Sequence, residues 1–236
     1  MIIPFRIGKN SSGEDQFVDL SELSLLMMSY SEEHVLNDFF QKIYLATYPY
    51  KESNYLITNS RRLKLWGGNN EVDRIFLKDE PLETSINSRK QVFKSLTDEI
   101  LRREQILKSK KIKDFKRYFS LNLWNKDKLS YQFLVVDDIW DIVTAKPKGL
   151  GLNLIRIMLY GPAVGIHTIF ASGISYRNLL QHLVNINPAI TKILQEKYGV
   201  PEPTQISVLG SELIYSPDGL IFYRKNRFAE LEKYYP

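Results

Sequence analysis

Short apolar runs alternate along this chain with segments whose apolar residues recur at the helical period, a pattern typical of an α/β sheet with crossover helices. The runs predict buried strands, at residues 23–29, 55–58, 131–136 and 165–171. The periodic segments predict helices, from 31 to about 46, from 88 to about 110, at 150–159 and at 175–185. Two further strands, 212–215 and 220–223, are expected to pair across a turn at 217–219.

The clearest predicted helix runs from residue 88 to about residue 110. Its buried stripe holds five positions three or four residues apart, Val92, Leu96, Ile100, Arg103 and Leu107. Residues 67–88 show no such period and begin with the turn-forming run Gly-Gly-Asn-Asn, so an irregular connection is expected there. Because the chain has no internal repeat, low-complexity tract or long linker, it is predicted to form a single domain over 1–236.

The composition is that of an ordinary globular protein, with 44% hydrophobic and 25% charged residues. Cys is absent, which excludes disulfides, a thiol nucleophile and Cys-ligated metal sites. The three His residues show no paired spacing, so no metal site is expected. The apolar runs are far shorter than a membrane span and the N-terminus lacks the layout of a signal peptide, which predicts a soluble cytoplasmic protein.

The net charge of +5 is unevenly placed along the chain. Residues 102–117 hold eight basic and two acidic residues, a net +6, so the rest of the chain sums to −1. Such a segment is either a solvated helix end or a nucleic-acid contact, and the candidates for that contact are Lys108, Lys110, Lys111, Lys113, Lys116 and Arg117. Phe115, Tyr118 and Phe119 interleave with these cations, either as a base-stacking surface or as residues that pack on the core.

Two acidic residues, Asp137 and Asp138, directly follow the apolar run 133–136. In nucleotide-hydrolysing α/β sheets a strand delivers an Asp at its carboxyl end, where it orders water around the Mg²⁺ of the nucleotide, and an adjacent acid activates the attacking water. The alternative is structural, because any buried strand can end in an Asp that caps the next helix.

Taken in order, these segments resemble the motor domain of the FtsK/SpoIIIE DNA translocases, within the FtsK–HerA group of RecA-like ATPases. The resemblance runs from about Phe5 to Tyr223. Residues 163–172 are similar to the family's Ala-Ala-Gly-Ile-His-Leu-x-x-Ala-Thr strand, 99–104 to its Glu-Met-x-Arg-Arg helix, and 135–138 to its second acidic motif. The resemblance implies a RecA-like α/β fold of the FtsK–HerA type, with a mostly parallel sheet flanked by helices.

The resemblance breaks down where the family binds its nucleotide. A phosphate loop needs glycines, which let backbone N–H groups wrap the phosphates, and a Lys that meets them. The corresponding segment here has neither residue type, since it reads Tyr30, Ser31, Glu32, Glu33 and His34. The comparison therefore implies a degenerate Walker A loop and the loss of ATP and Mg²⁺ binding.

Three further positions depart from the family. Asp138 stands where the family has a catalytic Glu, Gly173 where it has a polar residue, and Pro162 where it has an Arg. The resemblance thus implies that Asp137 and Asp138 form a vestigial acidic motif and that the chain has no catalytic residue.

These features favour a non-catalytic function, that of a pseudo-ATPase domain acting as a scaffold or partner-binding subunit. The resemblance implies other FtsK-like subunits as partners, in an oligomer or complex for DNA translocation, conjugation or protein secretion, which includes the cytoplasmic face of a membrane-associated machine. Three alternatives stay open: an active ATP-dependent DNA translocase, a nucleic-acid-binding module that uses residues 102–117, and a protein-docking module. His167 lies inside an apolar strand and is expected to be a core residue with satisfied hydrogen bonds.

Overall fold

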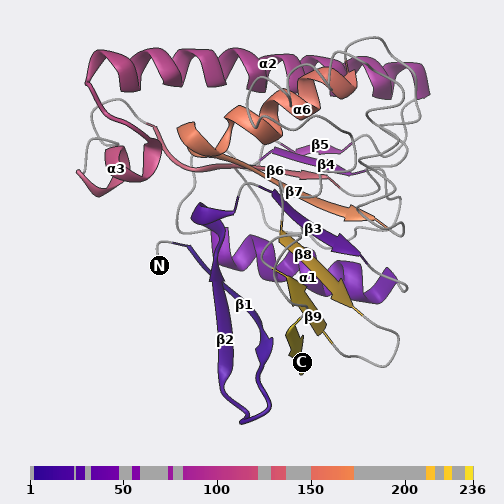
Figure 1. The fold of residues 1–236 in the computed structure, drawn as a ribbon. Coiled ribbons are helices and arrows are strands. Elements are labelled where there is room, and N and C mark those ends of the chain that lie inside the picture. The colour runs from indigo at the N-terminus through magenta and orange to yellow at the C-terminus, as the bar shows by residue number, and fades with distance from the viewer. Residues whose placement is uncertain are drawn as a thin grey trace, which may run out of the picture.

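The computed structural model describes the chain over residues 3–23, 25–29, 33–47, 55–58, 74–76, 82–121, 129–136, 150–172, 211–215, 221–224 and 232–235. These residues form an eight-stranded sheet, a separate two-stranded hairpin, and helices that cover both faces of the sheet (Figure 1). The long helix α2 (Leu82–Ser109) and α6 (Leu150–Tyr160) lie on one face, and α1 (Glu33–Thr47) lies on the other.

The sheet has the strand order β10-β9-β8-β3-β7-β6-β4-β5. Its strands are β3 (Leu25–Ser29), β4 (Tyr55–Thr58), β5 (Arg74–Phe76), β6 (Gln132–Val136), β7 (Ile166–Ser172), β8 (Ser211–Tyr215), β9 (Ile221–Arg224) and β10 (Glu232–Tyr234). All neighbours from β8 to β5 pair in parallel, whereas β9 and β10 are antiparallel additions at one edge. The predicted fold class, a mostly parallel sheet flanked by helices, is confirmed.

The four predicted buried strands are present as β3, β4, β6 and β7, and the predicted C-terminal pair is present as β8 and β9. Strands of a parallel sheet covered on both faces have no solvent side, so they read as continuous apolar runs. All five residues of β6 are buried, as are the four residues from Leu25 to Met28 in β3. The helix predicted at 175–185 lies outside the described residues.

The stripe predicted on α2 is confirmed, because Val92, Leu96, Ile100, Arg103 and Leu107 are all buried. The predicted start of this helix is wrong, since α2 begins at Leu82, and the irregular connection expected at 67–88 also contains β5. Leu82 precedes Ile100 by eighteen residues, five full helical turns, so the apolar phase of the stripe already begins there. The residues directly after Leu82 are mostly polar, so the helical period of apolar residues cannot be recognised there in the sequence. Strand β5 has three residues, which are too few to give an apolar run.

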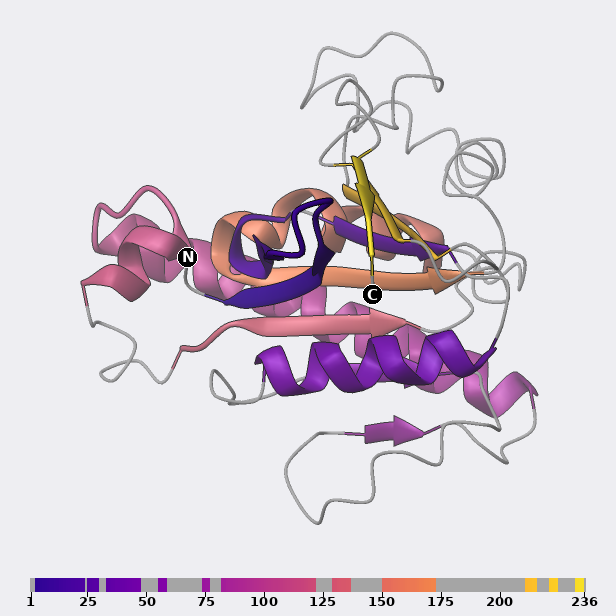
Figure 2. The same cartoon turned by 90° about the horizontal axis from the view of Figure 1, so that it is seen from below.

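The N-terminal hairpin and the short helix α3 (Phe115–Ser120) were not among the predicted elements. The hairpin consists of β1 (Pro4–Lys9) and β2 (Asp15–Asp19), and its turn is fixed by the side chain of Asn10, which accepts hydrogen bonds from the backbone N–H groups of Ser12 and Glu14. The hairpin projects from the body of the molecule, and α3 lies at one extremity in both views (Figures 1 and 2).

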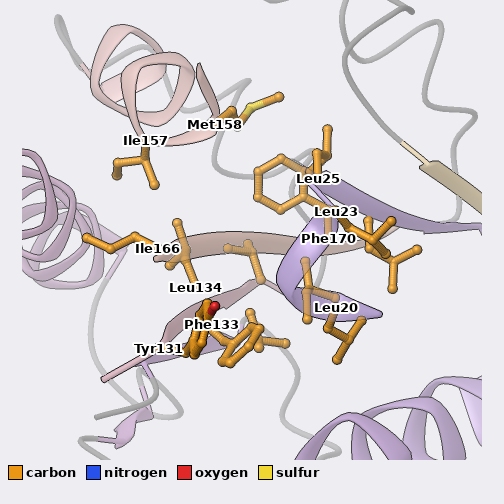
Figure 3. Close-up of a cluster of buried hydrophobic side chains, with 14 of the residues drawn as sticks. Leu20, Leu23, Leu25, Tyr131, Phe133, Leu134, Ile157, Met158, Ile166 and Phe170 are labelled. Carbon is orange, nitrogen blue, oxygen red and sulfur yellow. The ribbon is translucent and has the colours of Figure 1, made fainter. Parts of the chain in front are cut away.

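The core extends over both faces of the sheet. In Figure 3, Ile157 and Met158 of α6 lie on one side of β7, while Tyr131 and Phe133 lie on the other side. Each of these four side chains is at most 2% exposed. Among the described helices, none combines the length and the apolar character needed to cross a bilayer.

Candidate functional site

The carboxyl edge of the parallel strands is the first candidate site. The chain leaves β3 for β4, on the far side of β7, and leaves β7 for β8, on the far side of β3. The connections of these two neighbouring strands therefore run in opposite directions. Ligands of open α/β sheets bind outside the carboxyl ends of the strands at such a switch point, so a small ligand would be expected beyond the ends of β3 and β7.

The register shows where the strand that precedes the predicted acidic motif ends. Ser29 and Ser172, the last residues of β3 and β7, pair with each other, and Val136 at the end of β6 pairs with Phe170. Val136 directly precedes Asp137 and Asp138 in the sequence. The two acidic residues themselves lie outside the described residues.

The connection from β3 to α1 is the segment for which the sequence resemblance implies a phosphate loop. Strand β3 ends at Ser29 and α1 begins at Glu33, so three residues, 30–32, join them. Tyr30, Ser31 and Glu32 lie outside the described residues, while Glu33 and His34 form the start of α1. A helix N-terminus attracts anions through its free N–H groups and its dipole, and the first residue of α1 is the acidic residue Glu33.

The opposite, amino edge of the sheet holds a buried polar centre around Arg103. Its guanidinium donates hydrogen bonds from Nη1 to the carbonyl oxygens of Ser130, at 2.8 Å, and Val164, at 3.0 Å. Ser130 and Val164 lie just before β6 and β7, and a single residue separates each of them from its strand. Arg103 also donates from Nε to Glu99 Oε1 at 2.7 Å, and its guanidinium carbon lies 5.3 Å from the ring centre of Phe115. One side chain of α2 thus ties together the starts of two central strands and α3.

Glu99 is the shared counter-ion of Arg103 and Arg102. Arg102 donates to both Glu99 oxygens, at 2.6 and 2.7 Å, but its side chain is 53% exposed, whereas that of Arg103 is 2% exposed. Burial by itself would raise the pKa of Glu99, but the hydrogen bonds from Arg102 and Arg103 outweigh it and hold the pKa below its ordinary value. Glu99 therefore stays a carboxylate and balances the buried guanidinium.

The prediction that His167 is a core residue is confirmed. His167 is 3% exposed, and its ring packs against Phe133 and Tyr131 with centroid distances of 5.6 and 5.7 Å. Its Nδ1 lies 2.7 Å from the carbonyl oxygen of Leu23, which only accepts, so Nδ1 carries the proton of the neutral ring. Burial lowers the pKa of His167 to about 4, against the opposing effect of that hydrogen bond. Its Nε2 has no hydrogen-bond partner within the described part of the chain.

The predicted basic residues lie together at the end of α2 and the start of α3. Lys108, Lys110, Lys111, Lys113, Lys116 and Arg117 are all exposed. The wider segment 102–117 is not one charged surface, because Arg103 is a core residue. The base-stacking interpretation is wrong, since Phe115 and Tyr118 are buried and Phe119 packs against the core. Sequence reasoning put Arg103 on the buried stripe but did not foresee its polar partners, which come from segments distant in sequence.

The described residues bring together no group of three His, Asp or Glu side chains that could hold a metal ion. The polar groups of the amino edge are directed at backbone carbonyls and at one another. Their arrangement fixes the starts of the strands.

The fold matches solved structures of ATPase domains from secretion and conjugation proteins. The cytoplasmic domain of the type VII secretion ATPase EccC from Thermomonospora curvata matches 99% of this chain with a TM-score of 0.65 at 15% identity. The pCW3 conjugation coupling protein TcpA matches 99% with a TM-score of 0.61 at 14% identity. EssC (ATPases 2 and 3) from Geobacillus thermodenitrificans matches 99% with a TM-score of 0.58 at 16% identity.

The match covers 28% of the EccC chain, 65% of TcpA and 44% of EssC, so this chain spans only a part of each. No protein-family model and no curated protein matches the sequence. At identities this low, the likeness shows the fold, and it confirms the expectation that the chain is built like an FtsK-type ATPase domain.

Proposed function

We propose that the chain is a non-catalytic FtsK/SpoIIIE-like domain, a pseudo-ATPase, that serves as a scaffold or partner-binding subunit of a secretion or conjugation machine. The fold supports the statement that the chain is an FtsK/SpoIIIE-like domain. The connection from β3 to α1 is the observation that supports a non-catalytic function.

A phosphate loop closes successive backbone N–H groups around the phosphates, adds a Lys on the β- and γ-phosphates, and places a Ser or Thr on Mg²⁺. Only residues 30–32 join β3 to α1, and neither they nor Glu33 and His34 include Gly or Lys. Glu32 and Glu33 bring negative charge to the position where a triphosphate would need positive charge. These residues do not fit Mg-ATP, which supports a degenerate Walker A loop and a vestigial role for Asp137 and Asp138.

The solved structures suggest the setting. EccC is described as a type VII secretion ATPase, TcpA as a conjugation coupling protein, and EssC as a chain with ATPases numbered 2 and 3. In our proposal residues 1–236 form one such domain, which associates with other FtsK-like subunits in an oligomer or larger complex. The matched parts of EccC and EssC are described as cytoplasmic domains, so we place this chain in the cytoplasm, on the cytoplasmic face of such a machine.

Thermal unfolding with and without millimolar Mg-ATP tests the loss of nucleotide binding. A ligand present at a hundred times its dissociation constant stabilises the native state by about 2.7 kcal/mol. For a chain of this size that corresponds to about 5–10 °C in melting temperature. We expect no shift and no turnover. A clear shift, with DNA-stimulated hydrolysis that is lost in Asp137→Ala, would refute the proposal and favour the active translocase.

Sedimentation velocity of the chain with a purified, active FtsK-type ATPase tests the scaffold role. A complex of fixed stoichiometry is expected whether or not ATP is present. Two independently sedimenting species, together with a nucleotide-induced shift in melting temperature, would contradict both parts of the proposal.

A further inference from the structure

The entire net charge of the chain lies in ten residues, 108–117. This segment holds six basic residues and one acidic residue, a net +5, which equals the net charge of the whole chain. The remaining residues contain 26 basic and 26 acidic side chains and are therefore neutral as a set. We call the six cations the basic corner: Lys108, Lys110, Lys111, Lys113, Lys116 and Arg117.

The basic corner is a built turn with defined hydrogen bonds. At the end of α2, Ile112 N–H donates to Leu107 O at 2.9 Å and Lys111 N–H donates to Lys108 O at 3.0 Å. This pair of bonds closes the helix C-terminus. At the start of α3, the Asp114 carboxylate caps the helix by accepting from the backbone N–H of Arg117 at 2.9 Å. The backbone therefore holds the cations at set positions.

Lys111 occupies a conformation that favours glycine. Its φ of 54° lies in the left-handed region, where a Cβ is disfavoured and where helices commonly end in Gly. Gly at this position would end α2 at a lower cost in conformational free energy than Lys does. The lysine therefore places a positive charge at the apex of the corner in a backbone conformation that costs more free energy for Lys than for Gly.

The cations reach solvent at one end of the molecule. Side-chain exposure is 78% for Lys108 and 53% for Lys116, and these two residues form surface ion pairs with Glu104 and Glu22. Figures 1 and 2 both place α3 and the end of α2 at one extremity of the molecule. The corner therefore protrudes, and it can meet a surface without obstruction from the described part of the chain.

The chemistry of the corner fits lipid phosphates better than a single-stranded nucleic acid. Five of its six cations are Lys, which meets phosphate as a point charge. Proteins that bind single-stranded nucleic acid without sequence preference use a basic groove with aromatic side chains that stack on bases, whereas Phe115 and Tyr118 are buried here and the corner protrudes. Leu121, directly after α3, is 45% exposed, and an exposed apolar side chain beside lysines suits the headgroup region of a bilayer.

We propose that the basic corner binds the surface of a membrane rich in anionic phospholipids. The short 3-10 helix 162–164, which precedes β7, contacts both α2 and α3, so the corner lies at the amino edge of the sheet. Binding there turns the amino edge toward the membrane and leaves the carboxyl edge of the sheet facing away. The proposal involves no nucleotide, so it stands or fails separately from the pseudo-ATPase function.

Co-sedimentation with phosphatidylglycerol/phosphatidylcholine vesicles at physiological ionic strength tests the proposal. Each basic residue near an anionic bilayer contributes about five-fold in binding. A Lys111→Gly, Lys113→Gln, Arg117→Gln variant should therefore bind about a hundred-fold more weakly. Lys111→Gly alone should also weaken binding while raising the melting temperature by about 2 °C, because the backbone strain is relieved. If Lys111 had a purely structural role, Lys111→Gly would not weaken binding while it raised the melting temperature.

The matched control is Lys90→Gln, Lys94→Gln, Arg156→Gln, which removes the same charge from exposed positions of α2 and α6. It should keep binding within about two-fold of the wild type. An equal loss in the control would show that net charge alone matters and would overturn the proposal. So would equal binding to pure phosphatidylcholine vesicles, or binding to a random-sequence DNA duplex without binding to anionic vesicles at the same phosphate concentration.

Discussion

Replacement of Arg103 tests how the amino edge of the sheet is held together. The side chain spans three elements, since it reaches from α2 to the carbonyl oxygens of Ser130 and Val164 and stacks over Phe115 of α3. An Arg103→Ala change removes these contacts together and leaves both carbonyl oxygens in the interior without this donor. Glu99, the third partner, is 21% exposed and can be hydrated after the change.

The magnitude follows from these contacts. A hydrogen bond to a charged group contributes about 1.5–3 kcal/mol, and removal of one partner of a buried ion pair typically costs about 3–5 kcal/mol. Because Glu99 can be hydrated, we expect Arg103→Ala to lower the free energy of unfolding by about 4 kcal/mol. This is a large part of the roughly 5–15 kcal/mol that stabilises a typical protein.

Arg102 provides a matched control, because it is the neighbouring residue, has the same charge and contacts the same Glu99. Its side chain is exposed, so Arg102→Ala should cost at most about 1 kcal/mol. Arg103→Lys keeps the charge but cannot reproduce the forked geometry of the guanidinium, and it should cost about 2 kcal/mol. Urea unfolding followed by far-UV circular dichroism gives all three values, provided that the slope with urea is unchanged.

A loss below about 1.5 kcal/mol for Arg103→Ala, or equal losses for the two alanine variants, would refute this reasoning. If Arg103→Ala does not fold, the comparison of Arg103→Lys with Arg102→Lys decides, since only the former should be measurably destabilised. A double-mutant cycle with Glu99→Gln then separates the ion pair from the two carbonyl bonds.

Two further predictions concern the same region. His167 is neutral in the folded chain and has a pKa of about 4 there, against about 6.5 when unfolded, so the unfolded chain binds more protons between these values. The free energy of unfolding should fall by about 3 kcal/mol as the pH drops from about 6.5 to about 4, and His167→Asn should lack this fall, so that the difference between the two pH curves shows it; parallel curves for the two proteins would contradict the assignment. Gly165 has a φ of +79° and a Cβ placed there would lie 2.2 Å from Phe115 Cδ1, whereas Gly13 has a φ of +81° and nothing within 4 Å. Gly165→Ala should therefore lower the free energy of unfolding by about 3 kcal/mol and Gly13→Ala by about 1 kcal/mol, and similar urea midpoints for the two variants would disprove the clash.

The elements that could be predicted from sequence are those with one dominant physical signal. Strands β3, β6 and β7 are covered on both faces and read as apolar runs, and the stripe of α2 reads as a helical period even where it includes Arg103. The elements that escaped prediction depend on contacts between distant segments. Strand β5 forms because it pairs with β4 at the sheet edge, and α3 forms where the buried residues Phe115 and Tyr118 anchor it to the core.

The same distinction applies to the candidate sites. A charge count found the basic corner, because exposed lysines need no partner to be recognised. It also overestimated the charged segment, because the sequence alone does not reveal that Arg103 points inward to carbonyl groups 27 and 61 residues away. The polar centre of the amino edge was therefore visible only in the folded chain.

The two segments with the clearest resemblance to FtsK-type motors meet each other in space. Glu99 and Arg103 belong to the segment that resembles the Glu-Met-x-Arg-Arg helix, and Arg103 bonds Val164, in the segment that resembles the Ala-Ala-Gly-Ile-His strand. In that second segment, Gly165 packs on Phe115. The matched residues that the structure describes thus include those that fix the starts of the strands, while residues 30–34, where the resemblance implies a phosphate loop, depart from the family. Under the proposed pseudo-ATPase function, the chain would keep the residues that pack the fold and lack those that bind phosphate, and this combination would suit a scaffold subunit.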